Sequence, residues 1–169
     1  MKMNTISMAR LKSVLRYDPA TGHFTRAVKV NNFEIGSVAG RLTHKGYIEI
    51  KIDGVAYQAH RLAWFYSYGE WPPQFVDHKN GNRADNRLEN IRLASPSENG
   101  QNQALRSDNT SGIKGVTWCK REQSWRVAGC VNGYQSLVGS FKDLELAELV
   151  SIEFRNKYHG SFANHGAHQ

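Results

Sequence analysis

Residues 75 to 102 read FVDHKNGNRADNRLENIRLASPSENGQN, and this stretch decides how the rest of the chain is interpreted. Phe75-Val76 and Ile91-Arg92-Leu93 are short apolar runs of the kind that form strands. Between them, Asn80-Gly81-Asn82 is strong turn chemistry that opens a polar loop. The pattern therefore predicts a strand, a polar loop and a second strand.

A helix is expected to follow the second strand. Ser95 can cap the backbone N–H of Glu98, and the Glu98 side chain can reach back to the Ser95 N–H. Pro96 suits the first helical position, where no backbone donor is needed. Asn99 then lies about one turn into this helix.

Four polar residues in this stretch carry chemistry: Asp77 and His78 at the end of the first strand, Asn90 before the second, and Asn99 on the helix. Cutting a phosphodiester needs a cation near the phosphate, a base for water and a group that orients the base. Oxygen atoms of Asp77 and Asn99 suit Mg²⁺. His78 can accept a proton at neutral pH, and Asn90 can hold its ring through a hydrogen bond.

Two observations weigh against this interpretation. Strand alternation points the neighbours Asp77 and His78 to opposite sides unless the strand end is twisted. Taken singly, an Asp-His pair also fits a solvated strand end, and asparagine-rich loops are usually turns. Taken together, the four residues support the phosphodiester-cleaving interpretation more strongly than any one of them does alone.

As a set, Asp77-His78, Asn90 and Asn99 resemble the HNH nucleases of the ββα-metal fold, in the His-Asn-Asn variant of phage and group I intron homing endonucleases. His60-Arg61-Leu62-Ala63-Trp64 and Gly69-Glu70-Trp71-Pro72 also resemble that family. The resemblance implies that His78 is the general base, Asn90 its orienting residue, and Asp77 and Asn99 the metal ligands. Asn99 stands where many members have a second histidine, which favours Mg²⁺ or Mn²⁺ over zinc.

The composition of the 169 residues favours a folded, basic protein. Hydrophobic residues make up 40% of the chain, no apolar run is long enough to span a membrane, and residues 1 to 10 lack a signal-peptide core. We therefore expect a protein of the cytoplasm, in a bacterial host cell if the phage resemblance holds. Cys119 and Cys130 are too few for a disulfide framework or a four-cysteine zinc site. The net charge of +7 favours polyanionic partners.

Upstream of residue 75 the pattern predicts helices and short strands. Thr5 to Tyr17 has helical spacing, with Thr5 or Ser7 as a cap. The expected elements after it are strands at residues 23–26 and 35–40, a hairpin of residues 47–52 and 55–59 turning at Asp53-Gly54, and a helix from His60 to Tyr68.

Downstream, residues 105–112 are polar and small and read as a linker. Three strands over residues 115–118, 125–131 and 135–141 and a helix capped by Asp143 then predict a sheet with one buried face. Trp125, Val127 and Gly129 should face the helix. Charge is divided here: residues 113–142 carry five lysines and arginines against one glutamate, a net of +4, whereas residues 143–158 carry −2.

This segment resembles an Apetala-type (ethylene-response-factor) DNA-binding domain. The resemblance covers about residues 113–163 and rests on residues 111–116, Trp118, residues 125–127, residues 137–141 and residues 159–163. It implies a sheet laid in the major groove of DNA. His159, His165 and His168 are interpreted as tail residues rather than metal ligands. The residues expected to contact DNA, with neighbours of the predicted nuclease site included, are His60, Arg61, Lys79, Arg83, Lys114, Thr117, Lys120, Arg121, Arg126, Gln135 and Leu137. For His60 a helix-start or core position is the stronger alternative.

The sequence thus predicts an α+β protein: a ββα-metal nuclease domain with upstream hairpins and helix, then a three-stranded antiparallel sheet packed on one helix. The expected boundaries are 1–104 for the nuclease domain, 105–112 for the linker, 113–164 for the DNA-binding domain and 165–169 for a tail. The expected activity is metal-dependent cleavage of double-stranded DNA to 5′-phosphate and 3′-hydroxyl ends, with no membrane or small-molecule cofactor. A non-catalytic, sequence-specific DNA-binding regulator is the alternative, and an RNA-cutting enzyme a third. The oligomeric state, monomer or dimer, stays open.

Overall fold

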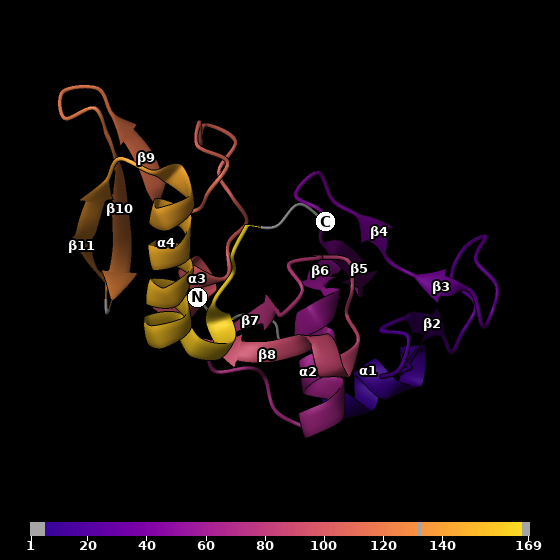
Figure 1. Ribbon diagram of the computed structural model, residues 1–169. Helices are drawn as coiled ribbons and strands as arrows, with labels where there is room; N and C mark the ends of the chain where they lie inside the picture. Colours follow the sequence, from indigo (N-terminus) through magenta and orange to yellow (C-terminus); the bar gives the residue numbers. More distant parts are fainter. Residues whose placement is uncertain (1–5, 132, 167–169) are drawn as a thin grey trace. The chain divides into compact units, whose positions relative to one another are not determined.

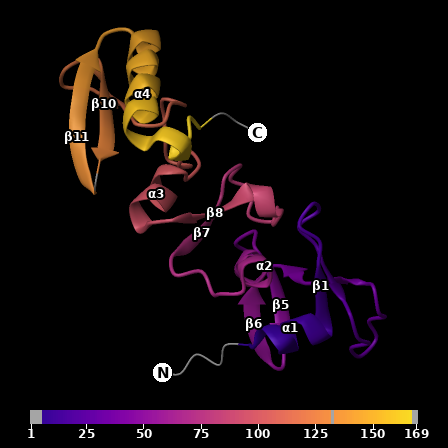
Figure 2. The ribbon, with the colours of Figure 1, turned by 90° about the horizontal axis from the view of Figure 1, so that it is seen from below.

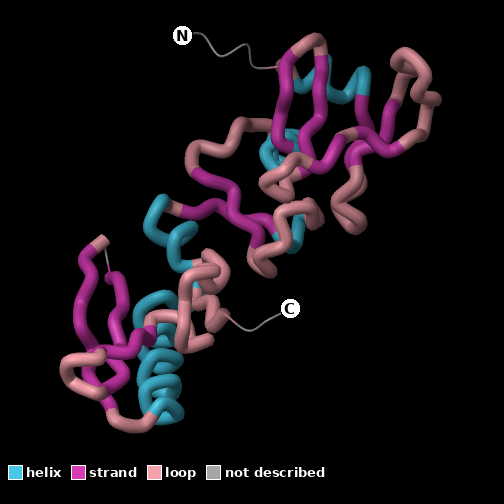
Figure 3. The backbone as a smooth tube through the Cα atoms, turned by 90° about the horizontal axis from the view of Figure 1, so that it is seen from above, coloured by secondary structure: helices cyan, strands magenta, loops and turns pink. Residues whose placement is uncertain are grey.

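The computed structural model describes residues 6–131 and 133–166, which fold into two compact units. The first unit ends at Ala94 and the second begins at Ser95. Figure 1 follows the chain along its helices and strands, and Figure 3 separates the two kinds of element by colour. The α+β class predicted from the sequence is confirmed. Within the described ranges, none of the helices has the length and apolar character needed to cross a membrane.

The first unit is built from three small antiparallel sheets and two α-helices. The sheets have the strand orders β1-β2-β3, β4-β5-β6 and β7-β8. In chain order the elements are α1 (Met8–Val14), β1 (Leu15–Tyr17), β2 (Phe24–Arg26), β3 (Val38–Ala39), β4 (Arg41–Leu42), β5 (Ile48–Ile52), β6 (Val55–Gln58), α2 (Ala59–Tyr68), β7 (Phe75–His78), the 3₁₀ helix η1 (Leu88–Asn90) and β8 (Ile91–Ala94).

The amino-terminal helix is shorter than its apolar spacing predicts. Ser7 caps α1 by accepting a hydrogen bond from the Arg10 N–H at 3.2 Å, and the other predicted cap, Thr5, lies outside the described residues. The expectation that the helix reaches Tyr17 is wrong, because Leu15 turns to an extended backbone and opens β1. Pairing of β1 with β2 replaces the last helical hydrogen bonds. The strand expected over residues 35–40 is likewise reduced to the two residues of β3.

The hairpin and helix that precede the predicted nuclease stretch are confirmed. Ile52 pairs with Val55 across a two-residue turn in which Asp53 and Gly54 both have positive φ, at 50° and 84°. Such a turn matches the twist of the two strands. Helix α2 ends at Gly69, whose left-handed backbone directs its N–H to the Phe65 carbonyl. Apolar residues from these elements and from α1, β1 and β2 form the core of the unit, including Leu11, Leu15, Phe24, Ile50, Leu62 and Val76.

The second unit is a three-stranded sheet packed on a long helix. Its strand order is β11-β10-β9, and Figure 2 shows α4 running along one face of the sheet. The elements are α3 (Pro96–Gln101), β9 (Val116–Cys119), β10 (Ser124–Val131), β11 (Tyr134–Phe141), α4 (Leu144–His159) and the 3₁₀ helix η2 (Gly160–Phe162).

One face of this sheet is buried against α4, as alternation along β10 predicts. Val127 is 1% exposed, and a Cβ on Gly129 would overlap the ring of Phe154 from α4. The opposite face stays open, with Leu137 63% exposed. His159, interpreted from the sequence as a tail residue, is instead the last residue of α4, which corrects that expectation. His168 lies outside the described residues.

Candidate active site

Asp77 and His78 end β7, where both side chains are buried. Asp77 lies opposite Arg92 of β8, and His78 lies opposite Ile91. Neighbouring residues of a regular strand alternate between its faces, and here the Asp77 carboxylate contacts Arg92 of β8 whereas the His78 ring contacts Asn86 of the loop. Only 7% of Asp77 and 4% of His78 is exposed. Both faces of the strand end are therefore covered.

The carboxylate of Asp77 forms an ion pair with Arg92. Asp77 Oδ2 accepts from Arg92 Nε at 3.0 Å and lies 2.9 Å from Arg92 Nη2. A charge held away from water needs a partner of opposite sign. Arg92 supplies that charge from directly across the hairpin, and it fixes the orientation of the Asp77 carboxylate.

The imidazole of His78 contacts Asn86 in the loop between β7 and β8. His78 Nε2 lies 3.2 Å from Asn86 Oδ1. Burial lowers the pKa of His78, and the hydrogen bond to Asn86 and the charges of Asp77 and Asp85 oppose that shift only in part. Since the ordinary pKa of histidine is about 6.5, the ring is neutral at pH 7. A neutral ring is the form that accepts a proton.

The contacts of Asn86 determine which nitrogen of His78 is the acceptor. Asn86 Nδ2 donates to the Ala84 carbonyl at 3.1 Å. That carbonyl only accepts, so the amide oxygen of Asn86 must face His78. An oxygen acceptor requires that Nε2 carry the proton of the neutral ring. The lone pair that accepts a proton is therefore on Nδ1.

The hydrogen bonds of the Asn90 side chain hold the loop between β7 and β8 rather than the imidazole ring of His78. Its Nδ2 donates to the Asp85 carbonyl at 2.8 Å, its Oδ1 accepts from the Asn80 N–H at 3.1 Å, and its carbonyl accepts from the Lys79 N–H at 2.8 Å. The side chain is 6% exposed. Asn90 thus closes both ends of the loop that presents Asn86 to His78, and it acts on the ring through that loop.

Asp85 adds a second set of contacts inside the same loop. Its carboxylate accepts from Arg87 Nε at 2.9 Å and from Asn80 Nδ2 at 2.8 Å. Hydrogen bonding to Arg87 lowers the pKa of Asp85 to about 2, with Asn80 contributing. The loop is therefore held by a charged network as well as by Asn90.

Aromatic rings surround His78 on the side of α2 and β5. The ring centroid of His60 lies 5.0 Å from that of His78 at an interplanar angle of 80°, and Tyr47 lies 6.1 Å from His78 and 5.3 Å from His60. His60 is 4% exposed, and burial first, then the charge of His78, lowers its pKa to about 3. The structure therefore places His60 in the core beside His78. A direct contact of His60 with DNA stays a prediction.

Asn99 lies on α3 in the second unit. The predicted capping box is confirmed: Ser95 Oγ accepts from the Glu98 N–H at 3.3 Å, and Glu98 Oε2 accepts from the Ser95 N–H at 2.7 Å. The Asn99 N–H donates to the Ser95 carbonyl at 3.0 Å, so Asn99 belongs to the first helical turn. The cap thus sets where along the helix the Asn99 side chain emerges.

The cations expected to contact DNA from the first unit each hold a backbone carbonyl. Arg61 donates to the carbonyls of Gln74 and Pro72 at 3.3 Å, and Lys79 to that of Glu89 at 2.6 Å. Arg83 donates to the Lys45 carbonyl at 3.1 Å and lies 5.1 Å from the Tyr47 ring centroid. Carbonyl partners leave the positive charges unneutralised.

The residues of the second unit that are expected to contact DNA lie in two places, on the strands of the sheet and in the turn between β9 and β10. Thr117 lies opposite Arg126 and Leu137 lies opposite Ala128, on the face that alternation turns away from α4. Gln135 lies opposite Cys130 and lines a cavity together with Phe154 of α4. Lys120 and Arg121 are exposed in the turn between β9 and β10.

Arg126 and Lys114 are less available than the sequence suggests. Arg126 forms an ion pair with Glu122, its Nε lying 3.2 Å from Glu122 Oε2, and the exposed Arg121 shares the same carboxylate at 3.3 Å. Lys114 is half-buried, and its ammonium donates to the Gln101 and Gln103 carbonyls.

Asn86, Arg92 and Tyr47 contact the candidate site but were not predicted from the sequence. Asn86 is one of four asparagines within residues 80–90, and nothing local separates it from a turn residue. Arg92 could have been paired with Asp77 only if the register of β7 and β8 had been known. Tyr47 reaches the site from a hairpin about thirty positions upstream, a separation that no periodicity reveals.

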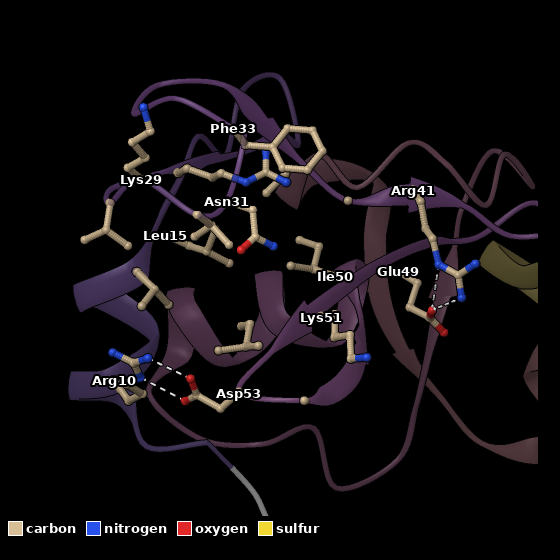
Figure 4. A pocket seen from close by; sticks show the side chains of 18 residues that line it. Arg10, Leu15, Lys29, Asn31, Phe33, Arg41, Glu49, Ile50, Lys51 and Asp53 are labelled. Atoms are coloured by element: carbon tan, nitrogen blue, oxygen red, sulfur yellow. Dashed lines mark hydrogen bonds and ion pairs between the residues drawn. The ribbon is translucent and has the colours of Figure 1, made fainter.

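A hollow of about 710 Å³ in the first unit is separate from these residues. It is lined by α1, β5 and the segment around residues 28–33, and none of its lining residues belongs to β7, β8 or the loop between them. Figure 4 shows two ion pairs at its edge, Arg10 with Asp53 and Arg41 with Glu49, each at 2.7 Å. Two of its lining cations therefore already have carboxylate partners.

Comparison with known proteins places the site within a family. The family model described as HNH endonuclease matches residues 57–101, which span α2, β7, β8 and α3. Protein 3.8 of Escherichia phage T7 is 36% identical over 107 residues, which is 62% of this chain and 86% of that protein. A solved structure described as DNA binding and cleavage by the HNH homing endonuclease I-HmuI is 23% identical, with a TM-score of 0.44 over 60% of this chain and 57% of the other. The chain belongs to the HNH endonuclease family and is a homologue of protein 3.8 of Escherichia phage T7.

Proposed function

We propose that this protein is a metal-dependent DNA endonuclease that hydrolyses phosphodiester bonds to 5′-phosphate and 3′-hydroxyl ends. The observation that carries the proposal is His78: a buried, neutral imidazole beside a carboxylate, inside the segment that matches the HNH endonuclease model. The resemblance to homing-type nucleases of phages supports the same assignment, and homology to a T7 protein agrees with a phage origin.

His78 is the general base in this proposal. Its lowered pKa keeps the ring unprotonated at pH 7, so that Nδ1 can take a proton from the attacking water. Asn86 keeps Nε2 as the donor, and Asn90 holds the loop on which Asn86 stands. Asn90 is thus a positioning residue that acts through the loop.

Asp77 and Asn99 would hold a divalent cation, Mg²⁺ or Mn²⁺. The donor chemistry fits, because a carboxylate and an amide supply the oxygen ligands that these ions prefer. Within residues 6–131 and 133–166 no group of three or more His, Cys, Asp and Glu side chains is arranged for a metal, so most positions would fall to water and phosphate oxygens. When bound, the ion would offset negative charge on the phosphate and the departing oxygen. Arg92 orients the Asp77 carboxylate for this task.

The second unit would bind DNA through the open face of its sheet and the turn at Lys120 and Arg121. Basic side chains supply salt-dependent affinity for the phosphate backbone. The Apetala-type resemblance supports this role, and double-stranded DNA is the proposed partner. The boundaries 1–104, 105–112 and 113–164 remain our proposed domain limits.

A cleavage assay on supercoiled plasmid distinguishes this proposal from the alternative, a DNA-binding regulator without catalysis. The protein is expected to convert the plasmid to nicked or linear DNA with Mg²⁺, and chelation with EDTA should stop the reaction. The ends should be ligatable without phosphorylation, as 5′-phosphate ends are. Retained DNA binding without cleavage, in the presence of Mg²⁺, Mn²⁺, Ca²⁺ and Zn²⁺ in turn, would favour the regulator and end the enzyme proposal.

A further inference from the structure

The second unit contains a cavity of about 730 Å³ whose walls are mostly small residues. Gly115, Ala128 and Gly129 line it from the sheet side, and α3 with its cap contributes Ser95, Pro96, Ser97, Gly100 and Gln101. Its basic lining residues are Lys114, Arg155 and His159, and no aspartate or glutamate is among the lining residues. The cavity is therefore electropositive and large enough for a small ligand.

Arg155 is a buried cation that forms no ion pair among the described residues. The residue is 4% exposed. Its Nη1 donates to Ser151 Oγ at 2.8 Å and to the Lys114 carbonyl, and its Nε donates to His165 Nδ1 at 3.3 Å. Nη2 is buried with no hydrogen-bond partner among the described residues. Burial lowers the pKa of Arg155, and the charge of Glu148 opposes that shift only in part. An isolated buried guanidinium is unfavourable, which makes an anion the missing partner.

Lys114 adds a second uncompensated positive charge. Its ammonium donates to the carbonyls of Gln101 at 2.7 Å and Gln103 at 2.5 Å. Burial, and then the charge of Arg155, lowers the pKa of Lys114 to about 8, and burial with both of these cations lowers the pKa of His165. The two cations thus repel each other across a region without a carboxylate ligand, and an anion between them would relieve that repulsion.

His159 lies one helical turn from Arg155 on α4 and offers a hydrogen-bond acceptor. Its Nε2 lies 2.9 Å from the Cys130 carbonyl, which only accepts, so Nε2 is the donor. In the neutral ring Nδ1 is then an acceptor, and it is buried without a hydrogen-bond partner among the described residues. Anionic phosphate oxygens match the two cations, and inorganic phosphate, which keeps one O–H group at neutral pH, also offers a donor to Nδ1.

The hollow in the first unit differs in its charge pairing. There Arg10 and Arg41 each have a carboxylate partner at 2.7 Å, and Figure 4 shows both pairs. In the cavity of the second unit, Lys114 and Arg155 have no such partner among the described residues.

We propose that the cavity lined by Lys114, Arg155 and His159 is a binding site for a phosphate group. The group would be either free phosphate or nucleotide, or a phosphate of a DNA strand. The proposal goes beyond the nuclease function and does not rest on it, because it needs neither the β7–β8 hairpin nor a metal.

Titration of the isotopically labelled full chain with inorganic phosphate tests the proposal. Backbone amide signals of Gly115 and Gly129, which line the cavity, are expected to shift with saturation, whereas sodium chloride at matched ionic strength should not produce those shifts. Absence of saturation, or saturating shifts confined to residues outside the cavity, would overturn the proposal. This titration needs no variant, so it decides the location even where a substitution harms the fold.

Arg155→Met tests the role of the buried charge. Replacing an unpaired buried cation by an apolar side chain of similar length is expected to keep the fold, which thermal melting would verify. Phosphate affinity measured by calorimetry should fall about tenfold or more, since charge-assisted hydrogen bonds are lost. Lys157→Met is the matched control, because Lys157 is an exposed cation on the same helix and does not line the cavity. Equal affinity in Arg155→Met and the parent chain, or equal losses in the two variants, would contradict the site.

Competition identifies the source of the phosphate. Displacement of bound phosphate by a short DNA duplex supports a site for the DNA backbone. Simultaneous binding of duplex and phosphate supports a site for free phosphate or a nucleotide, and deoxyadenosine monophosphate should then compete with inorganic phosphate.

Discussion

Asn86 is the residue on which the chemistry of His78 depends most directly. Because its amide oxygen faces His78 Nε2 at 3.2 Å, it fixes the tautomer and the orientation of the ring. Asn86→Ala is therefore expected to lower the cleavage rate by about 10- to 100-fold, as small misplacements of catalytic groups do. DNA affinity should change little, since the side chain is 3% exposed.

The control for Asn86 is Asn82→Ala in the same loop. Asn82 is exposed and its side chain accepts only from the Ala84 N–H among the hydrogen bonds described. We expect less than about a threefold change in rate, within the range of ordinary surface substitutions. Equal losses in the two variants would mean that the loop as a whole matters and that Asn86 has no special relation to His78.

His60 makes stability depend on pH. Its pKa is about 3 in the folded state and about 6.5 when unfolded, so between these values only the unfolded state binds the proton. The folded state is therefore favoured above pH 6.5 and loses that advantage as the pH falls. From pH 7 to pH 5 the expected loss from His60 is about 2 kcal/mol, to be measured by urea unfolding. His78, whose pKa is also lowered, changes stability in the same direction.

His60→Phe keeps a ring beside Tyr47 and His78 and removes this titration. Its free energy of unfolding should fall less steeply below pH 6.5 than that of the parent chain. His44→Gln serves as the control, because the His44 side chain is exposed, and the slope of this variant should match that of the parent chain. A parent-like slope in His60→Phe would show that the acid sensitivity comes from other groups.

At the scale of elements, local signals were predictive and distant pairing was not. The capping box at Ser95, the turn at Asp53-Gly54 and the alternation of β10 each depend on residues close in sequence, and the structure confirms them. The predicted end of α1 was wrong, because Leu15–Tyr17 instead form β1, which pairs with β2 across a turn.

The residues of the candidate site also divide into those that the sequence suggested and those that only the tertiary structure revealed. Its motif residues were named from the family resemblance, whereas Asn86, Arg92 and the ring of Tyr47 became visible only through tertiary contacts. The phosphate cavity was not foreseen, because its charged residues come from separate segments around residues 114 and 155–159. Uncompensated burial of a charge is a property of the fold and leaves no sequence pattern.

Alanine substitutions at two glycines of the second unit are expected to change its stability in opposite directions. A Cβ at Gly129 would lie 1.9 Å from the Phe154 ring, so Gly129→Ala should destabilise the packing of β10 on α4 by about 1–3 kcal/mol. Gly100 in α3 has no neighbour within 4 Å of an added Cβ, and Gly100→Ala should stabilise the helix by up to about 1 kcal/mol. Thermal unfolding measures both. Destabilisation by Gly100→Ala would contradict the description of α3.

For the whole molecule, the net charge of +7 acts through particular exposed cations. Lys120 and Arg121 are exposed in the turn between β9 and β10. If each neutralises one phosphate, changing both to Ala should lower the slope of log affinity against log salt by about 1.8, because each contact contributes about 0.9.

The control is Lys157→Ala on α4, which covers the other face of the sheet. Its salt slope should match that of the parent chain. An unchanged slope in the double variant would remove the turn from the DNA interface and leave the open face of the sheet to be tested next.

The most direct test of the central claim is single-turnover cleavage of supercoiled plasmid by His78→Ala, with DNA binding measured in parallel. The account predicts cleavage by the parent chain with Mg²⁺, a rate about 10²- to 10⁴-fold lower for His78→Ala, and equal DNA affinity for the two proteins. His23→Ala, which removes a histidine outside β7 and its loop, should cleave like the parent chain. Cleavage by His78→Ala within threefold of the parent rate would contradict the assignment of His78 as the general base.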